Sequence, residues 1–184
     1  MHGKRWNLVS VLILFAGAIW IWTSSAPAAS SSEEIEAPRV GFRAPDFSLP
    51  LADGSANVTL SELRGQPVLI NFWATWCSPC RAEMPAIQKM YDEYQGRGFI
   101  VLGINSASGD AREDILAFIQ EYQLSFPILV DGNDQVFQQY QVRGLPTSIF
   151  VDADGKIQDI VVGGPMSEAL LRVRIENLTS GEVR

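Results

Sequence analysis

Short apolar runs alternate with longer amphipathic segments from about residue 67 onward. The runs have the length and continuous apolar character of strands buried on both faces, and they lie at 67–73, 99–104 and 126–130. Apolar residues at helical spacing predict helices at 79–95, 110–123, 134–141 and 167–179. Ser167 is expected to cap the last of these helices. Strands that alternate with helices in this way indicate an α/β domain.

Two hairpins are predicted on either side of this alternating region. Phe47-Ser48-Leu49 is typical of a short extended segment, Asp53-Gly54 of a turn, and residues 58–60 of its partner strand. Near the C-terminus, the turn Asp152-Ala153-Asp154-Gly155 joins a strand ending at Val151 to a return strand. Antiparallel pairing added to parallel strands makes the sheet mixed, so we expect a three-layer α/β fold with a mixed central sheet.

Residues 1–23 have the pattern of an export signal. Lys4 and Arg5 precede an apolar stretch that ends at Trp22. Counted from Trp6, a helix there would span about 25 Å, which is marginal for a hydrocarbon core of about 30 Å. An uncleaved single-pass signal anchor and a signal peptide cleaved near residues 26–28 both fit this segment. Because positive residues stay inside, both alternatives place the rest of the chain on the extracytoplasmic side of the cell membrane.

Composition separates the remaining chain into two parts. Residues 24–40 are dominated by Ser, Ala, Pro and Glu and are predicted to be a flexible linker, which leaves residues 41–184 as one domain. The net charge of the chain is −7, and the side chains other than Lys4 and Arg5 carry −9. This acidic balance argues against nucleic acid as a partner. Contact with a membrane is expected only through the N-terminal helix.

The only two cysteines, Cys77 and Cys80, lie where a predicted buried strand turns into a helix. A thiol at a helix N-terminus meets unpaired backbone N–H groups and the positive end of the helix dipole, and both favour the thiolate. Cys77 is therefore the candidate nucleophile and Cys80 the resolving thiol of a redox-active disulfide. A purely structural disulfide is the alternative, but closing so short a loop contributes only about 2 kcal/mol.

Three features of residues 40–180 resemble the TlpA/ResA-like membrane-anchored thiol–disulfide oxidoreductases of the thioredoxin superfamily. One is an additional helix and strand at about 107–130. The others are Leu145-Pro146-Thr147 before an apolar strand and the segment Asn71-Phe72-Trp73-Ala74-Thr75-Trp76-Cys77-Ser78-Pro79-Cys80-Arg81-Ala82-Glu83-Met84-Pro85. The resemblance implies a thioredoxin-like fold with an N-terminal β extension and an inserted helix–strand unit.

The resemblance also implies where a substrate binds. Thioredoxin-like folds hold a cis-proline opposite the cysteine pair, so the Leu145-Pro146 bond is expected to be cis. Because proline offers no N–H, the backbone groups of Leu145 can pair with an extended substrate chain. We expect the substrate-binding residues to be Trp76, Pro79, Leu145, Pro146 and Thr147.

Glu83 is the candidate proton acceptor and donor. Thioredoxins carry a buried aspartate at the position matched here by Asn71, which cannot exchange a proton usefully. Glu83 follows Cys80 by three residues and lies one turn further along the same helix face. In the resembled group a glutamate at this spacing lies near the cysteines. Poor solvation would raise its pKa, and it could then take the proton of Cys80. The alternative is a solvated glutamate on the helix surface.

The resemblance implies a function for the whole chain: reduction of disulfides in client proteins outside the cytoplasm. Family clients include the haem-binding cysteine pairs of apocytochromes c and the copper-site cysteine pairs of oxidase assembly proteins. The oxidised enzyme would be recharged by a membrane electron donor of the DsbD/CcdA type. A thiol oxidase or isomerase shares every residue named above, and the redox potential of Cys77 and Cys80 distinguishes these directions.

Other classes of function fit the sequence less well. A peroxidase of related fold needs Thr or Ser three residues before the reactive cysteine and Pro seven before it, whereas this chain has Ala74 and Ile70. A zinc site needs about four ligands, and besides the two cysteines the chain offers only His2, far away in the N-terminal segment. We therefore expect no metal and no cofactor. A passive binding module stays open as an alternative.

Overall fold

The computed structural model describes residue 20, residues 35–106 and residues 109–180. The expected anchor and the linker as far as residue 34 therefore lie outside the described residues, apart from the exposed Trp20. Across those described residues, no helix combines the length and apolar character needed to cross a membrane. The compact unit begins at Ile35, within the stretch 24–40 that the composition predicts to be a linker. Glu36 forms a β-bridge with Arg43, and this contact ties the end of the predicted linker to the domain.

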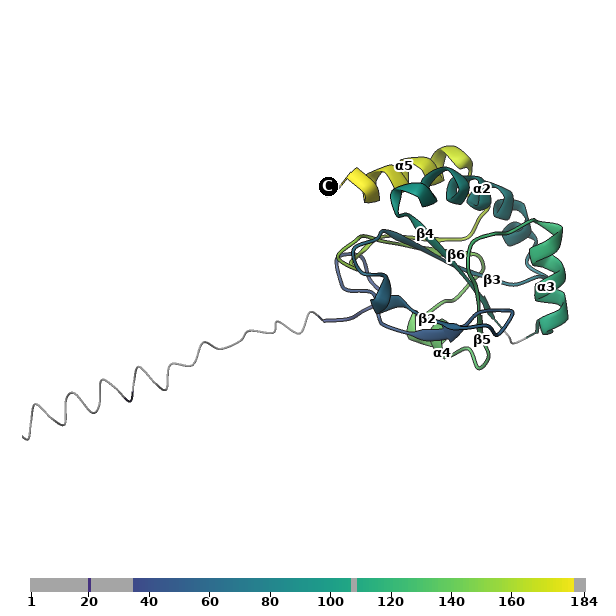
Figure 1. The fold of residues 1–184 in the computed structure, drawn as a ribbon, viewed down its shortest axis with the longest axis horizontal. Helices are drawn as coiled ribbons and strands as arrows, with labels where there is room; N and C mark the ends of the chain where they lie inside the picture. The colour runs from purple at the N-terminus through teal and green to yellow at the C-terminus, as the bar shows by residue number, and fades with distance from the viewer. Residues whose placement is uncertain (1–19, 21–34, 107–108, 181–184) are drawn as a thin grey trace, which may run out of the picture. The chain divides into compact units, whose positions relative to one another are not determined.

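A five-stranded mixed sheet forms the centre of the domain (Figure 1). The strands are β3 (Val68–Trp73), β4 (Ile100–Ser106), β5 (Ile128–Asp131), β6 (Thr147–Val151) and β7 (Ile157–Val162), in the order β5-β4-β3-β6-β7. The first three are parallel, and β6 and β7 each pair antiparallel with the preceding neighbour. All six residues of the central strand β3 are buried. The predicted mixed sheet is confirmed.

Three helices cover one face of the sheet: α2 (Ser78–Tyr94), α3 (Arg112–Glu121) and α5 (Glu168–Ser180). Side chains of β3 alternate between the two faces because successive residues of a strand point to opposite sides. Leu69 and Trp73 join the core beneath these helices, where the Trp73 ring lies 4.5 Å from the ring of Phe118. The helices α2 and α5 lie side by side (Figure 1), and their exposed edges are joined by an ion pair between Lys89 and Glu168.

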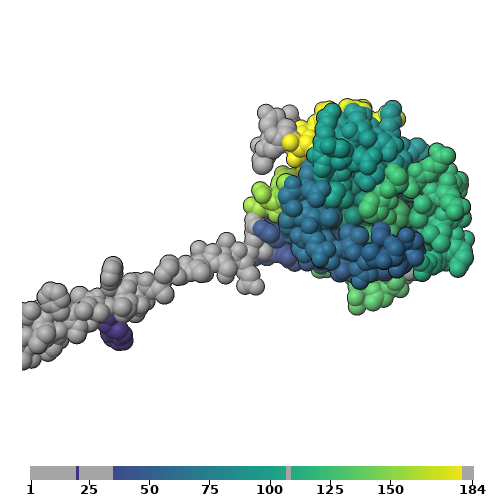
Figure 2. Space-filling model, viewed as in Figure 1, coloured from purple at the N-terminus to yellow at the C-terminus, as the bar shows by residue number. Residues whose placement is uncertain are grey.

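The opposite face of the sheet carries a second core. Ile70 and Phe72 of β3 pack there against Phe47 and Tyr140. This layer consists of the hairpin β1 (Ser48–Pro50) and β2 (Asn57–Thr59), the 3₁₀ segment η1 (Leu60–Leu63) and the short helix α4 (Gln135–Gln139). Part of this hairpin layer, in blue, forms a continuous stretch of the surface in Figure 2. The three layers, the N-terminal β extension and the inserted α3–β5 unit are as predicted.

Two helices are shorter than predicted. Helix α3 begins at Arg112 instead of residue 110 because the Asp110 carboxylate binds Thr75 across the fold and does not cap the helix. Helix α4 is bounded by residues with left-handed backbone, Asp134 with φ of 55° and Gln141 with φ of 53°. The cap predicted for α5 is present, since the Ser167 hydroxyl accepts a hydrogen bond from the N–H of Leu170 at 3.3 Å.

Candidate active site

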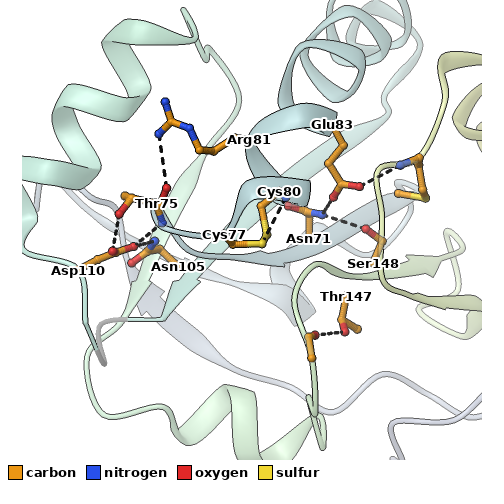
Figure 3. Close-up of a disulfide and its surroundings, with 12 residues drawn as sticks. Asn71, Thr75, Cys77, Cys80, Arg81, Glu83, Asn105, Asp110, Thr147 and Ser148 are labelled. Atoms are coloured by element: carbon orange, nitrogen blue, oxygen red, sulfur yellow. Dashed lines mark hydrogen bonds between the residues drawn. A yellow bond between two sulfur atoms is a disulfide. The ribbon is translucent and has the colours of Figure 1, made fainter.

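The two cysteines form a disulfide where β3 passes into α2 (Figure 3). Cys77 has extended backbone and is the N-cap of the helix, while Cys80 lies in its first turn. The Cys77 sulfur accepts a hydrogen bond from the N–H of Cys80 at 3.2 Å. Cys77 keeps 5% of its surface exposed and Cys80 none. A partner molecule can therefore reach Cys77 first, and the helix N-terminus stabilises negative charge on that sulfur.

Glu83 is fully buried, one turn beyond Cys80. One carboxylate oxygen accepts a hydrogen bond from the Asn71 amide at 2.8 Å, and the other accepts one from the N–H of Met166 at 3.1 Å. Burial raises the pKa of Glu83, although both hydrogen bonds act in the opposite direction. The solvated-glutamate alternative is therefore wrong, and the expected raised pKa is present. A carboxyl group of this kind can hold a proton at higher pH than a surface glutamate.

Asn71 connects Glu83 to the sheet. Its amide nitrogen also donates to the Ser148 hydroxyl at 2.9 Å (Figure 3). Its amide oxygen is buried and has no hydrogen-bond partner within the described part of the chain. The Asn71 side chain therefore faces the Glu83 carboxylate with its amide nitrogen as a hydrogen-bond donor, and this bond fixes the orientation of Glu83. Ser148 was not predicted as part of the site, because its contact depends on the antiparallel register of β3 and β6.

Gly164 approaches this carboxylate from the loop before α5. A Cβ atom at Gly164 would lie 2.7 Å from the Glu83 carboxylate oxygen and 2.7 Å from the ring of Pro146. Real Cβ atoms do not come this close to such neighbours, so the packing requires glycine. The Glu83 carboxylate and the ring of Pro146 therefore both lie against Gly164.

The Leu145-Pro146 peptide bond is cis, as expected from the sequence. A groove of about 510 Å³ lies beside it and is lined by Trp76, Cys77, Pro79 and Leu145, among others. Trp76 is 64% exposed, although its side chain is large and apolar. Neither backbone group of Leu145 makes a hydrogen bond with the rest of the described chain. The groove thus offers Cys77, an apolar wall and an unpaired backbone segment.

Thr147 does not line this groove. Its side chain is buried and donates a hydrogen bond to the carbonyl oxygen of Gly144 at 2.7 Å (Figure 3). The hydroxyl is therefore used to shape the proline loop, and the substrate contact expected at Thr147 stays a prediction. A second cis bond, between Gly164 and Pro165, was not predicted.

A second buried carboxylate, Asp110, holds the loop before Cys77 and was also not predicted. It accepts hydrogen bonds from the Thr75 N–H at 2.7 Å, from the Thr75 hydroxyl at 2.5 Å and from the Asn105 amide at 2.7 Å. Arg81 donates to the Thr75 carbonyl oxygen at 3.4 Å from the other side (Figure 3). The loop that carries the nucleophile is therefore fixed from both sides.

Comparisons with known proteins find relatives that are similar in sequence and in fold. The AhpC/TSA family model matches residues 40–160. The thiol-disulfide oxidoreductase ResA of Geobacillus thermodenitrificans is 37% identical over 145 residues, which is 79% of this chain and 81% of that protein. The chain belongs to the ResA-type thiol-disulfide oxidoreductases. The thioredoxin-like protein YneN of Bacillus subtilis, another relative of this ResA-type chain, is 38% identical over 161 residues, or 87% of this chain and 91% of YneN.

Solved structures agree with this membership in the ResA-type family. A thiol:disulfide interchange protein of the thioredoxin family from Chlorobium tepidum matches with a TM-score of 0.69 and 26% identity, covering 79% of this chain and 99% of that one. A secreted disulfide oxidoreductase of Mycobacterium tuberculosis, homologous to DsbE, matches with a TM-score of 0.65 and 27% identity, covering 72% and 96%. The chain is an enzyme of protein thiol–disulfide exchange, with Cys77 and Cys80 as its cysteine pair.

Proposed function

We propose that the protein is a membrane-anchored reductase that transfers two electrons from Cys77 and Cys80 to disulfides of client proteins outside the cytoplasm. The observation that carries this proposal is the unequal exposure of the two cysteines: Cys77 lines the groove and keeps 5% of its surface exposed, whereas Cys80 is fully buried one helical turn before Glu83. This asymmetry assigns the first attack to Cys77 and the second to Cys80.

The reaction begins with the reduced enzyme. The Cys77 thiolate attacks one sulfur of the client disulfide, so a bond forms between Cys77 and the client while the client's own S–S bond breaks. The second client sulfur leaves as a thiolate and is protonated from water. The N-terminus of α2 lowers the cost of the attacking thiolate, and the N–H of Cys80 points at its sulfur.

The second step releases the client. Cys80 loses its proton to the Glu83 carboxylate and attacks the Cys77 sulfur, which forms the Cys77–Cys80 disulfide and breaks the mixed disulfide. The remaining client sulfur leaves as a thiolate and takes up a proton. Because Cys80 is fully buried, a solvent base has poor access to its thiol, which supports Glu83 as the proton acceptor.

Client binding uses the groove beside the cysteine pair. The unpaired backbone of Leu145 supports strand-like pairing with an extended client segment, as in β-strand addition. Trp76 and Pro79 supply apolar contact on the other side of Cys77. Disulfides in apocytochrome c and in copper-site cysteine pairs are the proposed clients, as the resemblance to the TlpA/ResA-like group implies.

The location and the electron supply complete the proposal. The apolar stretch of the N-terminal segment and the secreted M. tuberculosis relative support a position on the extracytoplasmic face. Disulfides persist in that compartment, so a reductase there needs electrons from inside the cell. We propose a membrane donor of the DsbD/CcdA type that reduces the Cys77–Cys80 disulfide after each turnover.

Two measurements test the function. The dithiothreitol-reduced protein should accelerate insulin reduction, Cys77→Ser should abolish this activity, and Cys80→Ser should accumulate a mixed disulfide through Cys77. The midpoint potential of the Cys77–Cys80 couple should lie toward the reducing values of thioredoxin, about −270 mV. A potential near the oxidising value of about −120 mV would instead assign the protein as a thiol oxidase.

A further inference from the structure

Arg143 is the charged residue of the groove beside Cys77. Among the described residues that line this groove, which include Cys77 and Leu145, Arg143 alone carries a charge. It also lines an adjoining hollow of about 550 Å³. Arg143 is therefore the one cationic residue among the described residues that line the two hollows.

The Arg143 side chain is exposed and makes no hydrogen bond, ion pair or ring contact with any described residue. Other arginines of the domain are engaged: Arg81 pairs with Glu121, Arg172 with Glu93 and Arg174 with Asp159. An unpaired guanidinium keeps its five donors available for an incoming carboxylate, which it can bind with two parallel hydrogen bonds.

The position of Arg143 in the chain places it beside a bound client. It precedes Leu145 by two residues, and both residues line the groove that holds Cys77. A client strand that pairs with the Leu145 backbone and presents its disulfide to Cys77 therefore runs past Arg143. The client residue next to this guanidinium lies about two positions from the attacked cysteine.

The charge of the surrounding protein makes Arg143 a local site of attraction for a carboxylate. The chain as a whole is acidic, with a net charge of −7, so an acidic client is generally repelled by the domain. In the adjoining hollow Asp134 is the acidic residue, and its carboxylate accepts a hydrogen bond from Ser106 at 2.8 Å. A carboxylate is thus attracted at the side of the groove that also holds Cys77, where no acidic residue lines the wall.

We propose that Arg143 is a specificity-determining residue that favours client segments with an Asp or Glu side chain about two positions from the disulfide cysteine. This inference rests on the proposed reductase function and names the chemistry of its client. The contact is an ion pair at a partly solvated rim, so it is expected to change the rate constant for an acidic client by about three- to fivefold.

The test uses reduced full-length protein and short disulfide-bonded peptides. The peptides carry Glu, Gln or Lys two positions before the attacked cysteine, or two positions after it, and kcat/KM is measured for each. The wild-type protein should prefer Glu over Gln and Gln over Lys on one of the two sides. The preferred side reports the direction in which the client strand runs. The preference should shrink at about 0.5 M salt, where screening acts over a few ångströms.

Substitutions at Arg143 test whether this residue is the source of the preference for acidic peptides. Arg143→Gln should make the Glu and Gln peptides equal, and Arg143→Glu should reverse the preference toward Lys. Arg39→Gln is the matched control, because Arg39 is an exposed arginine that does not line the groove; it should keep the wild-type ratio. Equal rates for all wild-type peptides, or the same ratio in Arg143→Gln as in wild type, would overturn the inference while leaving the reductase function intact. Failure of wild-type protein to reduce any of the peptides would overturn the reductase function as well.

Discussion

The proton-binding role of Glu83 predicts a pH-dependent stability difference between the wild-type protein and Glu83→Gln. The substitution keeps the size of the side chain and removes its ionisation. Burial raises the pKa of Glu83 above its ordinary value of 4.5, so the folded state disfavours the carboxylate. The stability associated with the protonated form is complete below the pKa of the unfolded chain and is lost as the pH rises through the raised pKa of the folded protein. Glutamine does not titrate, so Glu83→Gln does not lose this stability as the pH rises.

The size of the stability difference follows from the difference between the pKa of Glu83 in the folded protein and in the unfolded chain. For every factor of ten by which folding favours the protonated carboxyl, ionising Glu83 in the folded protein costs about 1.4 kcal/mol. In a domain of this length, 1 kcal/mol corresponds to about 2–4 °C in Tm. For each tenfold preference of the folded protein for the protonated carboxyl, the Tm of Glu83→Gln should therefore rise relative to that of wild type by about 3–5 °C between pH 4 and pH 8. The new amide also changes hydrogen bonds to Asn71 and Met166, but this contribution is the same at every pH.

The assay is thermal unfolding of both oxidised proteins, followed by circular dichroism from pH 4 to pH 8. Oxidation is essential because Cys77 and Cys80 do not titrate while they form a disulfide. Glu113→Gln makes the same change at an exposed position of α3 and corrects for the general effect of removing one carboxyl group.

The refuting result is a difference in Tm that narrows or changes sign in favour of wild type as the pH increases. The folded protein would then stabilise the carboxylate, and Glu83 would be a weaker base than a surface glutamate. The transfer from Cys80 to Glu83 would have to be abandoned, although the exchange between Cys77 and the client would still stand.

Three further predictions concern stability and are measured by urea unfolding. Asp110→Ala leaves the part-buried donors of Thr75 and the buried amide of Asn105 unpaired and should lower the unfolding free energy by about 2–4 kcal/mol. Asp110→Asn should cost less than half as much, because its amide can donate to the Thr75 hydroxyl, and equal losses would contradict this account. Gly164→Ala forces a methyl group against Glu83 and should cost about 1–3 kcal/mol, so an unchanged midpoint would mean that the loop moves freely. Leu69→Ala, in the core, should cost about 2–5 kcal/mol, whereas Val173→Ala on the exposed side of α5 should cost less than about 0.5 kcal/mol.

The architecture was predictable because it follows from local patterns. The apolar run at 67–73 could only be a strand buried on both faces, and the helical spacing of Ile115 and Phe118 identified α3. The chemistry of Cys77 followed from its place at the N-terminus of a helix, and spacing put Glu83 on the same helix face as Cys80. The buried position of Glu83 was expected only from the family resemblance, with a solvated glutamate as the alternative.

Contacts between distant segments were not predictable in this way. Asp110 was expected to begin a helix, yet it binds Thr75 35 residues earlier in the chain. Ser148 reaches Asn71 only because of the register between β6 and β3. Thr147 was expected among the substrate-binding residues, and the hydrogen bond of its hydroxyl to the Gly144 carbonyl oxygen was not predicted. In each case the polar group is satisfied by a partner that no local pattern specifies, so three-dimensional pairing decided its place.

The close approach of Gly164 bears on how the buried acid communicates with water. Gly164 is exposed, yet its backbone lies directly against the Glu83 carboxylate, which is itself fully enclosed. At this residue only backbone atoms cover the acid, because glycine has no side chain. In the proposed mechanism a proton taken from Cys80 would have a short exit at this point, and a client pressed against Pro146 would cover that exit until it departs.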